Sequence, residues 1–145
     1  MASWSHYRNS LEIAENPIKS AFKDFSEILL HSLQFDPWNE NTWPDPWTLI
    51  DKNKYCAFSQ ILFLCYTLQL IKQYTQKKFS IVIYQNHDTH SIEFAFMIDT
   101  IYYFDPTKNT NNRTILNIKN IPPVHWGKKW KQRYKLLKEK DTKKI

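Results

Sequence analysis

The sequence predicts an α+β domain in which a buried central helix packs on an antiparallel sheet. Two observations lead to this fold class. Over residues 18–33 and 56–73, apolar side chains recur at three- and four-residue steps, which is the period of a helix. From residue 79 to residue 121, the pattern changes to short runs of strand-forming residues separated by turns. Helices followed by neighbouring strands are typical of an α+β fold.

One domain accounts for the hydrophobic content of the chain. The chain is 42% hydrophobic and 16% aromatic, which is enough for one core, and its 145 residues are the length of one domain of ordinary size. We expect a single domain over residues 1–125, with its core in residues 36–107. Residues 126–145 are expected to form a basic C-terminal tail.

The first predicted helix begins at Asn16 and Pro17, because Asn is a favourable N-cap and Pro is tolerated at the first helical position. Residues 1–9 before it are expected to be irregular. The apolar stripe continues to Leu33, and a proline soon after it ends the helix. Residues 34–54 hold three prolines and three tryptophans, which predicts a long loop packed by its own aromatic rings.

The second predicted helix begins at Cys56 and ends near Gln73. It is apolar nearly all round, so we expect it to be central and buried. Four strands are predicted after it as an antiparallel meander: Phe79–Tyr84, His90–Ile98, Ile101–Phe104 and the short edge strand Ile115–Ile121.

Composition excludes several classes of site. The chain has one glycine, whereas the Gly-rich phosphate loops need two or more. Cys56 and Cys65 lie nine residues apart on one predicted helix, which predicts neither a disulfide scaffold nor a zinc site. His87, Asp88 and His90 lack a third ligand segment, so we expect no metal and no cofactor. The chain opens without a charged-then-apolar leader and holds no stretch long enough to span a bilayer, so we expect a soluble cytoplasmic protein.

The positive charge belongs to the C-terminal tail. The formal net charge is +6, but residues 126–145 carry nine Lys or Arg against two Asp or Glu. The rest of the chain is therefore close to neutral. One hypothesis is nucleic-acid binding through the tail, where phosphate-pairing and base-stacking side chains alternate: Lys128, Lys129, Trp130, Lys131 and Arg133. A basic terminal run is more often a solvated tail.

Three residues have the chemistry of a thiol enzyme: Cys56, His90 and Asp105. A cysteine in the first turn of a helix lies where free N–H groups and the helix dipole favour an anion, which lowers the thiol pKa. The same N–H groups can hold an oxyanion. A histidine within reach can accept the thiol proton, and a carboxylate behind it fixes the imidazole tautomer. Taken singly, each residue also suits a structural role in a core, a strand or a turn.

The predicted hairpin puts His90 and Asp105 on one face of the sheet when its turn has two residues. With Ile98 and Asp99 in the turn, the two side chains are diagonal neighbours with backbones roughly 7–8 Å apart. With Asp99 and Thr100 in the turn, Asp105 moves further from His90 along the strand. A three-residue turn would place the two residues on opposite faces.

The run HSIEFAFMIDTIYYFDPT, residues 90–107, resembles the signature hairpin of the transglutaminase-like superfamily of papain-like cysteine proteases. In that family the catalytic histidine opens a strand, and the catalytic aspartate belongs to a D-P-T motif after a short turn. Upstream, WPDPWTLI (residues 43–50) and YCAFSQ (residues 55–60) resemble the bacterial and phage transglutaminase-like cysteine proteinases. The resemblance covers residues 36–107.

This resemblance implies a papain-like core and a thiol-dependent amide-bond hydrolase or acyl transferase. The substrate would be a peptide or protein amide, and the reaction would pass through an acyl-enzyme. The implied roles are nucleophile, base and orienting acid for Cys56, His90 and Asp105. Members of the family often use a Trp or Gln as oxyanion donor, and the candidates here, beside the N–H of the cysteine, are Trp43, Trp47 and Asn41. The tryptophans also suit loop packing.

Departures from the family pattern leave a second function open. The Gly-Asp pair that precedes the family's cysteine is Lys54-Tyr55 here, and the acidic residue two positions after it is Phe58. Family members that lack a full triad are often binding modules. The alternative hypothesis is therefore a non-catalytic interaction protein or a phage structural protein, located in the host cytoplasm or the virion. His87, in the predicted turn, is a second candidate base.

Overall fold

The computed structural model describes residues 4–106 and 112–123. Helical elements come first and strands follow, so the α+β class predicted from the sequence is confirmed. The elements in chain order are α1 (Trp4–Glu12), α2 (Pro17–Ser26), η1 (Glu40–Thr42), α3 (Pro46–Lys52), α4 (Ala57–Gln69), η2 (Lys72–Tyr74), β1 (Phe79–Asn86), β2 (Ser91–Ile98), β3 (Ile101–Tyr103) and β4 (Arg113–Asn120).

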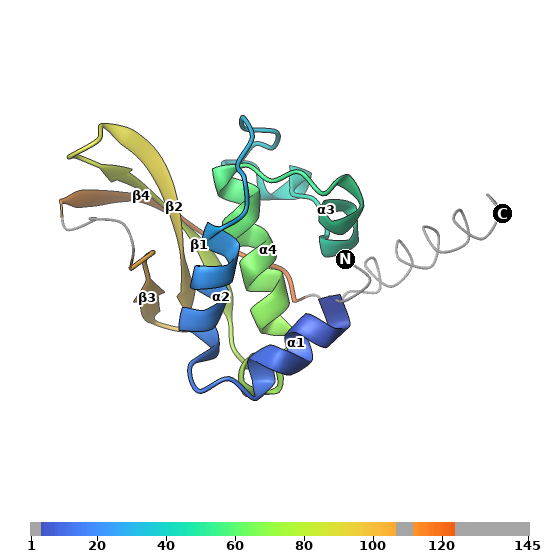
Figure 1. Cartoon of the computed structure of the whole chain (residues 1–145). Coiled ribbons are helices and arrows are strands. Elements are labelled where there is room, and N and C mark those ends of the chain that lie inside the picture. Colours follow the sequence, from blue (N-terminus) through green and yellow to red (C-terminus); the bar gives the residue numbers. More distant parts are fainter. Residues whose placement is uncertain (1–3, 107–111, 124–145) are drawn as a thin grey trace, which may run out of the picture.

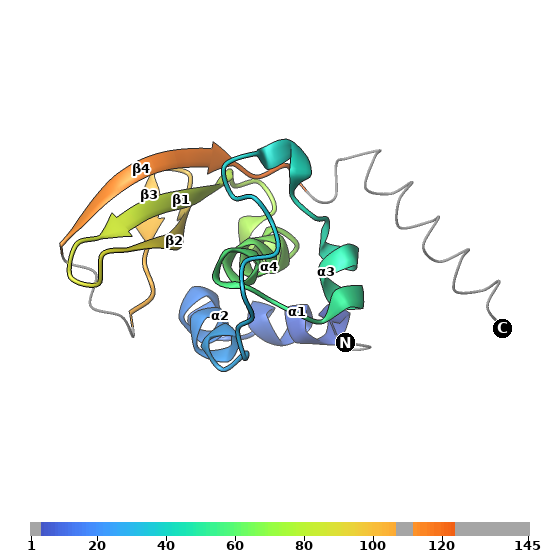
Figure 2. The same ribbon diagram turned by 90° about the horizontal axis from the view of Figure 1, so that it is seen from above.

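Helix α4 is the centre of the molecule, as its apolar sequence predicts. The sheet covers one side of it, and α1, α2 and α3 surround the others (Figures 1 and 2). Its most extensive contacts are with α2, α3, β1 and β2. Leu62, Leu64 and Leu68 are fully buried along its length. The helix begins one residue after Cys56, which is its N-cap, and ends at Gln69.

The sheet is antiparallel, with the strand order β3-β2-β1-β4. Ile98 pairs with Ile101, so the β2–β3 turn holds the two residues Asp99 and Thr100, one of the two turns that the sequence allows. Strand β4 returns to lie beside β1 instead of extending the row after β3. The order is therefore that of a Greek key, and the predicted simple meander is wrong in this respect.

The two faces of the sheet have different neighbours. Phe79, Ile81 and Ile83 of β1 belong to the main core with α4, together with Phe96 of β2. On the opposite face, Val82, Tyr84 and Ala95 form a second, small buried cluster against Met97 and Phe104. We call these the inner and the outer face.

Helix α2 is shorter than the sequence predicts. Its N-terminus is the predicted one, with the Asn16 side chain accepting a hydrogen bond from the Lys19 N–H at 3.1 Å. The helix ends at Ser26, however, and Leu29 and Leu33 of the predicted apolar stripe are exposed. After the helix, the chain is irregular and forms a parallel bridge between residues 30 and 55.

Two helices lie where the sequence predicts irregular chain. Trp4 of α1 is buried, and its Nε1–H donates to Thr67 Oγ1 of α4 at 3.0 Å, which ties the N-terminus to the core. In the predicted loop 34–54, α3 begins at Pro46 with Asp45 as N-cap. These two residues give the same N-cap and proline pattern that marks the start of α2.

Candidate functional site

Cys56 forms the N-terminal cap of α4 with its sulfur. The Ser59 N–H donates to Cys56 Sγ at 3.4 Å, and the Cys56 N–H donates to Ser59 Oγ at 2.9 Å. This reciprocal arrangement is a capping box in which a thiol takes the place of the usual hydroxyl. The predicted position of the cysteine at the head of the central helix is confirmed.

The thiol of Cys56 is in an environment that favours its anion. Burial raises the pKa of this thiol, but the Ser59 side chain and the N–H groups of Gln34, Ser59 and Phe58 hydrogen-bond to the sulfur and together outweigh burial. The net result is a pKa below the ordinary value of a cysteine. Cys65, in the middle of α4, is the opposite case, because complete burial raises the pKa of its thiol well above the ordinary value. Both cysteines are free.

A pocket of about 380 Å³ lies beside Cys56. Its lining is mostly apolar, and three large apolar residues on it are substantially exposed: Leu33, Trp38 and Ile92. The remaining lining residues are His31, Pro37, Cys56, Ala57 and Phe94. Although Cys56 is only 1% exposed, it therefore borders a space that a ligand side chain can enter.

The sequence predicts that His90 begins strand β2, but in the structure it lies in the turn before the strand. Asn86 pairs with Ser91, so four residues make the turn, and His90 is the last of them with a left-handed backbone (φ 58°). Histidine tolerates this conformation better than most residues. His90 is exposed, and the described lining of the Cys56 pocket contains Ile92 and Phe94 of β2 but not His90.

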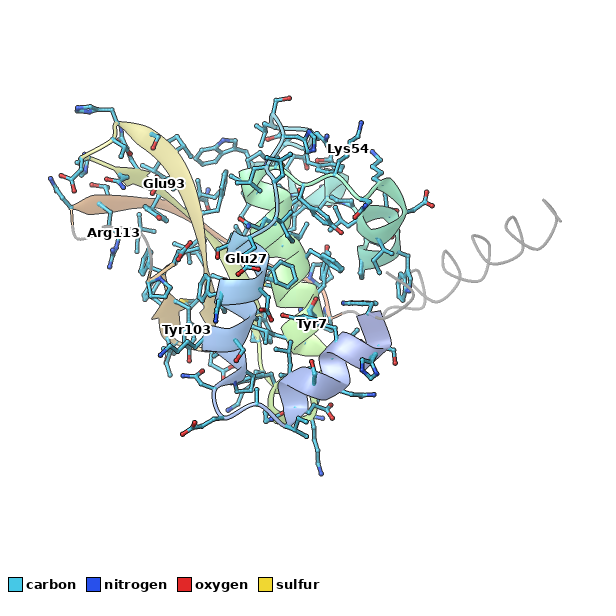
Figure 3. The ribbon with its side chains drawn as sticks, in the orientation of Figure 1. Tyr7, Glu27, Lys54, Glu93, Tyr103 and Arg113 are labelled. Carbon is cyan, nitrogen blue, oxygen red and sulfur yellow. The ribbon has the colours of Figure 1, made fainter. Side chains whose placement is uncertain are left out.

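Asp105 follows β3, and its carboxylate influences the pKa of a tyrosine on the outer face of the sheet. Burial and Glu93 raise the pKa of the Tyr84 hydroxyl, Arg113 counteracts them, and the Asp105 carboxylate raises it further. Tyr84 belongs to the outer-face cluster, and Figure 3 shows Glu93 and Arg113 on the side of β2 away from α4. Cys56 lies on the α4 side. The adopted β2–β3 turn is also the one that moves Asp105 away from His90. The structure thus does not gather the three residues around one pocket.

The oxyanion candidates lie in structural positions. Trp43 is buried against Phe58, with ring centroids 5.3 Å apart, and its Nε1–H donates to the Asp36 carbonyl at 3.2 Å. Trp47 packs edge-on against Trp4 at the N-terminus. Asn41 is exposed in the short helix η1. None of Trp43, Trp47 or Asn41 is in the described lining of the Cys56 pocket.

His31 is the histidine in the described lining of the Cys56 pocket, a position that its sequence context does not predict. Its N–H donates to the Tyr55 carbonyl at 2.8 Å, so its backbone is fixed one residue from the cysteine. The predicted helix continues to Leu33 and would place His31 on its solvated face, so the apolar pattern does not point to a pocket position for this histidine. His87 is engaged elsewhere, since its Nε2 lies 2.6 Å from Thr114 Oγ1 on β4.

The tail residues proposed for nucleic acid, Lys128 to Arg133, lie outside the described residues. In residues 4–106 and 112–123, no group of three or more His, Cys, Asp or Glu side chains is arranged to hold a metal ion. Within the same residues, no helix has the length and apolar character needed to cross a membrane.

Comparisons with protein-family models, with curated proteins and with solved structures give no match for this chain.

Proposed function

We propose that the chain is a thiol-dependent amide-bond hydrolase or acyl transferase in which Cys56 is the nucleophile. The observation that carries the proposal is the Cys56 sulfur itself, which caps α4, accepts several N–H groups and has a lowered pKa beside an open pocket. A low thiol pKa at neutral pH is what a cysteine nucleophile needs. The resemblance of residues 36–107 to the transglutaminase-like cysteine proteinases favours the same reaction class.

In the proposed reaction, the Cys56 thiolate attacks the carbonyl carbon of a bound amide, and a C–S bond forms. The C–N bond then breaks, and the departing amine takes a proton from a histidinium, which leaves a thioester. Water or a second amine attacks the thioester, gives its proton to the histidine and releases the thiolate. The apolar pocket beside Cys56 suits an apolar side chain next to the reacting amide.

Two histidines are candidates for the proton transfer. His31 is favoured by position, because it lines the pocket that Cys56 borders. His90 is favoured by the family motif, in which the histidine opens the hairpin. The proposed hydrolase or acyl transferase is compatible with either one, and the experiment below distinguishes them.

Alkylation by iodoacetamide at pH 7, followed residue by residue with mass spectrometry, tests the proposal. We expect Cys56 to react at least tenfold faster than Cys65, which is the matched control within the same helix. His31→Ala or His90→Ala should slow the reaction of Cys56, whereas His87→Ala should not. Equal and slow labelling of the two cysteines would contradict a nucleophilic Cys56.

A second candidate function is a non-catalytic interaction module. The observation that favours it is the separation of His90, in a solvent-exposed turn, and Asp105, near the outer face, from the Cys56 pocket. Incubation with an activated acyl ester separates the two functions. A stoichiometric acyl adduct on Cys56 that water or an amine then discharges supports the enzyme. An adduct that forms no faster than on denatured protein supports the binding module.

A further inference from the structure

A second cavity, of about 370 Å³, lies among α1, α2, α4 and the residues just before α4. Its walls include four aromatic rings, so we call it the aromatic pocket. The rings are those of Tyr7, Phe25, Tyr55 and Phe63. The volume is at the small end of the range for ligand sites, which suits one side chain or a ligand of similar size.

The four rings form a continuous wall. Tyr55 stacks on Phe63 with centroids 5.5 Å apart, and Phe25 meets Phe63 edge-on at 5.7 Å. Tyr7 lies 6.2 Å from Phe25 and extends the wall to α1 (Figure 3). The face of an aromatic ring carries partial negative charge, so a wall of this kind attracts cations as well as apolar groups.

The charge in the described lining of this pocket is negative. Asp24 of α2 is the one residue among the described lining that carries a full charge with histidine neutral, and neither Lys nor Arg is in that lining. The Tyr7 hydroxyl donates to Asp24 Oδ2 at 2.8 Å, which fixes the carboxylate at the rim beside the rings. An anionic ligand would meet this carboxylate, which repels it, with no Lys or Arg in the described lining to offset the repulsion.

We propose that the aromatic pocket binds an organic cation of the alkylammonium class, such as the side chain of lysine or methyl-lysine. The aliphatic stem packs on the rings, and the ammonium group lies between the ring faces and the Asp24 carboxylate. This proposal is independent of the thiol chemistry, because no step of it uses Cys56. The aromatic pocket and the Cys56 pocket share the lining residue His31 and are therefore adjacent.

Titration of the full chain, followed by amide chemical shifts, tests the proposal with three probes. These are Nα-acetyl-lysine methylamide, its Nε-trimethyl form, and the uncharged norleucine analogue of the same length. We expect at least one cation to saturate the shifts of residues in the aromatic pocket, with an affinity at least tenfold above that of norleucine. Equal affinity for the charged and the uncharged probes would overturn the proposal.

Asp24→Asn removes the charge and keeps the shape of the side chain. We expect the affinity for the bound cation to fall at least fivefold and the affinity for norleucine to stay the same. Asp51→Asn is the matched control, since Asp51 is an exposed acid on α3 outside the described lining of the pocket. The same loss in both variants, or in neither, would contradict a local role for Asp24.

Cys56→Ser separates this proposal from the proposed function. We expect the variant to bind the cation as tightly as the parent chain while it loses thiol reactivity. If Cys56 proves inert and the cation still binds, the aromatic pocket stands on its own. If Cys56 is reactive and the cation does not bind, only the proposal for the aromatic pocket fails.

Discussion

At the scale of single residues, the Cys56 sulfur has two roles. It accepts the Ser59 N–H at the start of α4, and the same hydrogen bond contributes to the lowered pKa of the thiol. The capping interaction and the lowered pKa of the thiol therefore depend on the same few atoms. Ser59, which is fully buried, completes the arrangement by accepting the Cys56 N–H.

Ser59→Ala tests this dependence. The substitution removes a hydrogen bond that favours the thiolate, so the pKa of Cys56 should rise and its alkylation rate at pH 7 should fall. It also leaves the Cys56 N–H without its partner, and we expect the free energy of unfolding to drop by about 1 kcal/mol. Alkylation rates from pH 6 to pH 10 and urea unfolding measure the two effects.

Ser26→Ala is the control for that experiment, because the Ser26 hydroxyl donates to a carbonyl of its own helix at the surface. It should leave the pH profile of Cys56 unchanged. A profile that is also unchanged in Ser59→Ala would show that Ser59 does not hold the thiolate.

The sequence predicts the position of Cys56 well and its partners poorly. A cysteine before an apolar helical run is visible in the residue pattern, because capping is local. The Gln34 N–H on the sulfur is 22 residues away in sequence and arrives only because α2 ends early and the following chain runs beside Tyr55. His31 reaches the pocket in the same way, so neither residue carries a local pattern that marks it.

At the scale of elements, caps explain where the helices begin. Asp45 shows this for α3, because its side chain accepts the Thr48 N–H at 2.7 Å while the residue is almost fully buried. The burial of Leu49 from the same short helix then depends on this cap to hold the first turn.

We expect Asp45→Ala to lower the free energy of unfolding by about 1 kcal/mol, as for other N-cap deletions. Asp45→Asn keeps the capping oxygen and should retain most of that stability, which makes it the matched control. Urea unfolding of both variants gives the comparison. Similar losses in the two variants would assign the effect to the charge of Asp45 instead of its cap.

Element ends were predicted less well than element types. The stripe of α2 includes Leu29 and Leu33 by spacing, yet both are exposed, because the helix ends at Ser26 and the chain after it no longer keeps the helical period. In the sheet, pairing of β1 with β2 extends to Asn86, and this takes His90 out of the strand and into the turn. The end of α2 and the start of β2 are both set by pairing between distant segments, which the periodicity of the residues does not reveal.

At the scale of the whole molecule, the positive charge is concentrated in the tail, residues 126–145, while residues 1–125, which we call the body, are close to neutral. The hypothesis of nucleic-acid binding predicts that single-stranded DNA binds the full chain and that salt weakens the binding. Lys128→Gln with Lys129→Gln should then reduce the slope of log affinity against log salt by about 1.4, since each phosphate contact contributes roughly 0.7. Binding measured by fluorescence anisotropy at several salt concentrations provides the slope.

The control pair is Lys52→Gln with Lys54→Gln, which removes the same charge from exposed positions of the body. It should leave the slope unchanged. An equal change in the two double variants would mean that net charge, and not the tail, governs the binding.

The Greek-key order of the sheet has a consequence for how the molecule assembles. The β1–β2 hairpin closes through a turn of four residues, whereas Ser80 of β1 meets Asn120 of β4 across forty. Closing the longer loop costs more chain entropy, so we expect β4 to dock on a hairpin that is already formed. Most of its side chains are exposed, and its outer edge pairs with none of the other described strands. We therefore expect the backbone amides of β4 to exchange with solvent before those of the central β1–β2 hairpin.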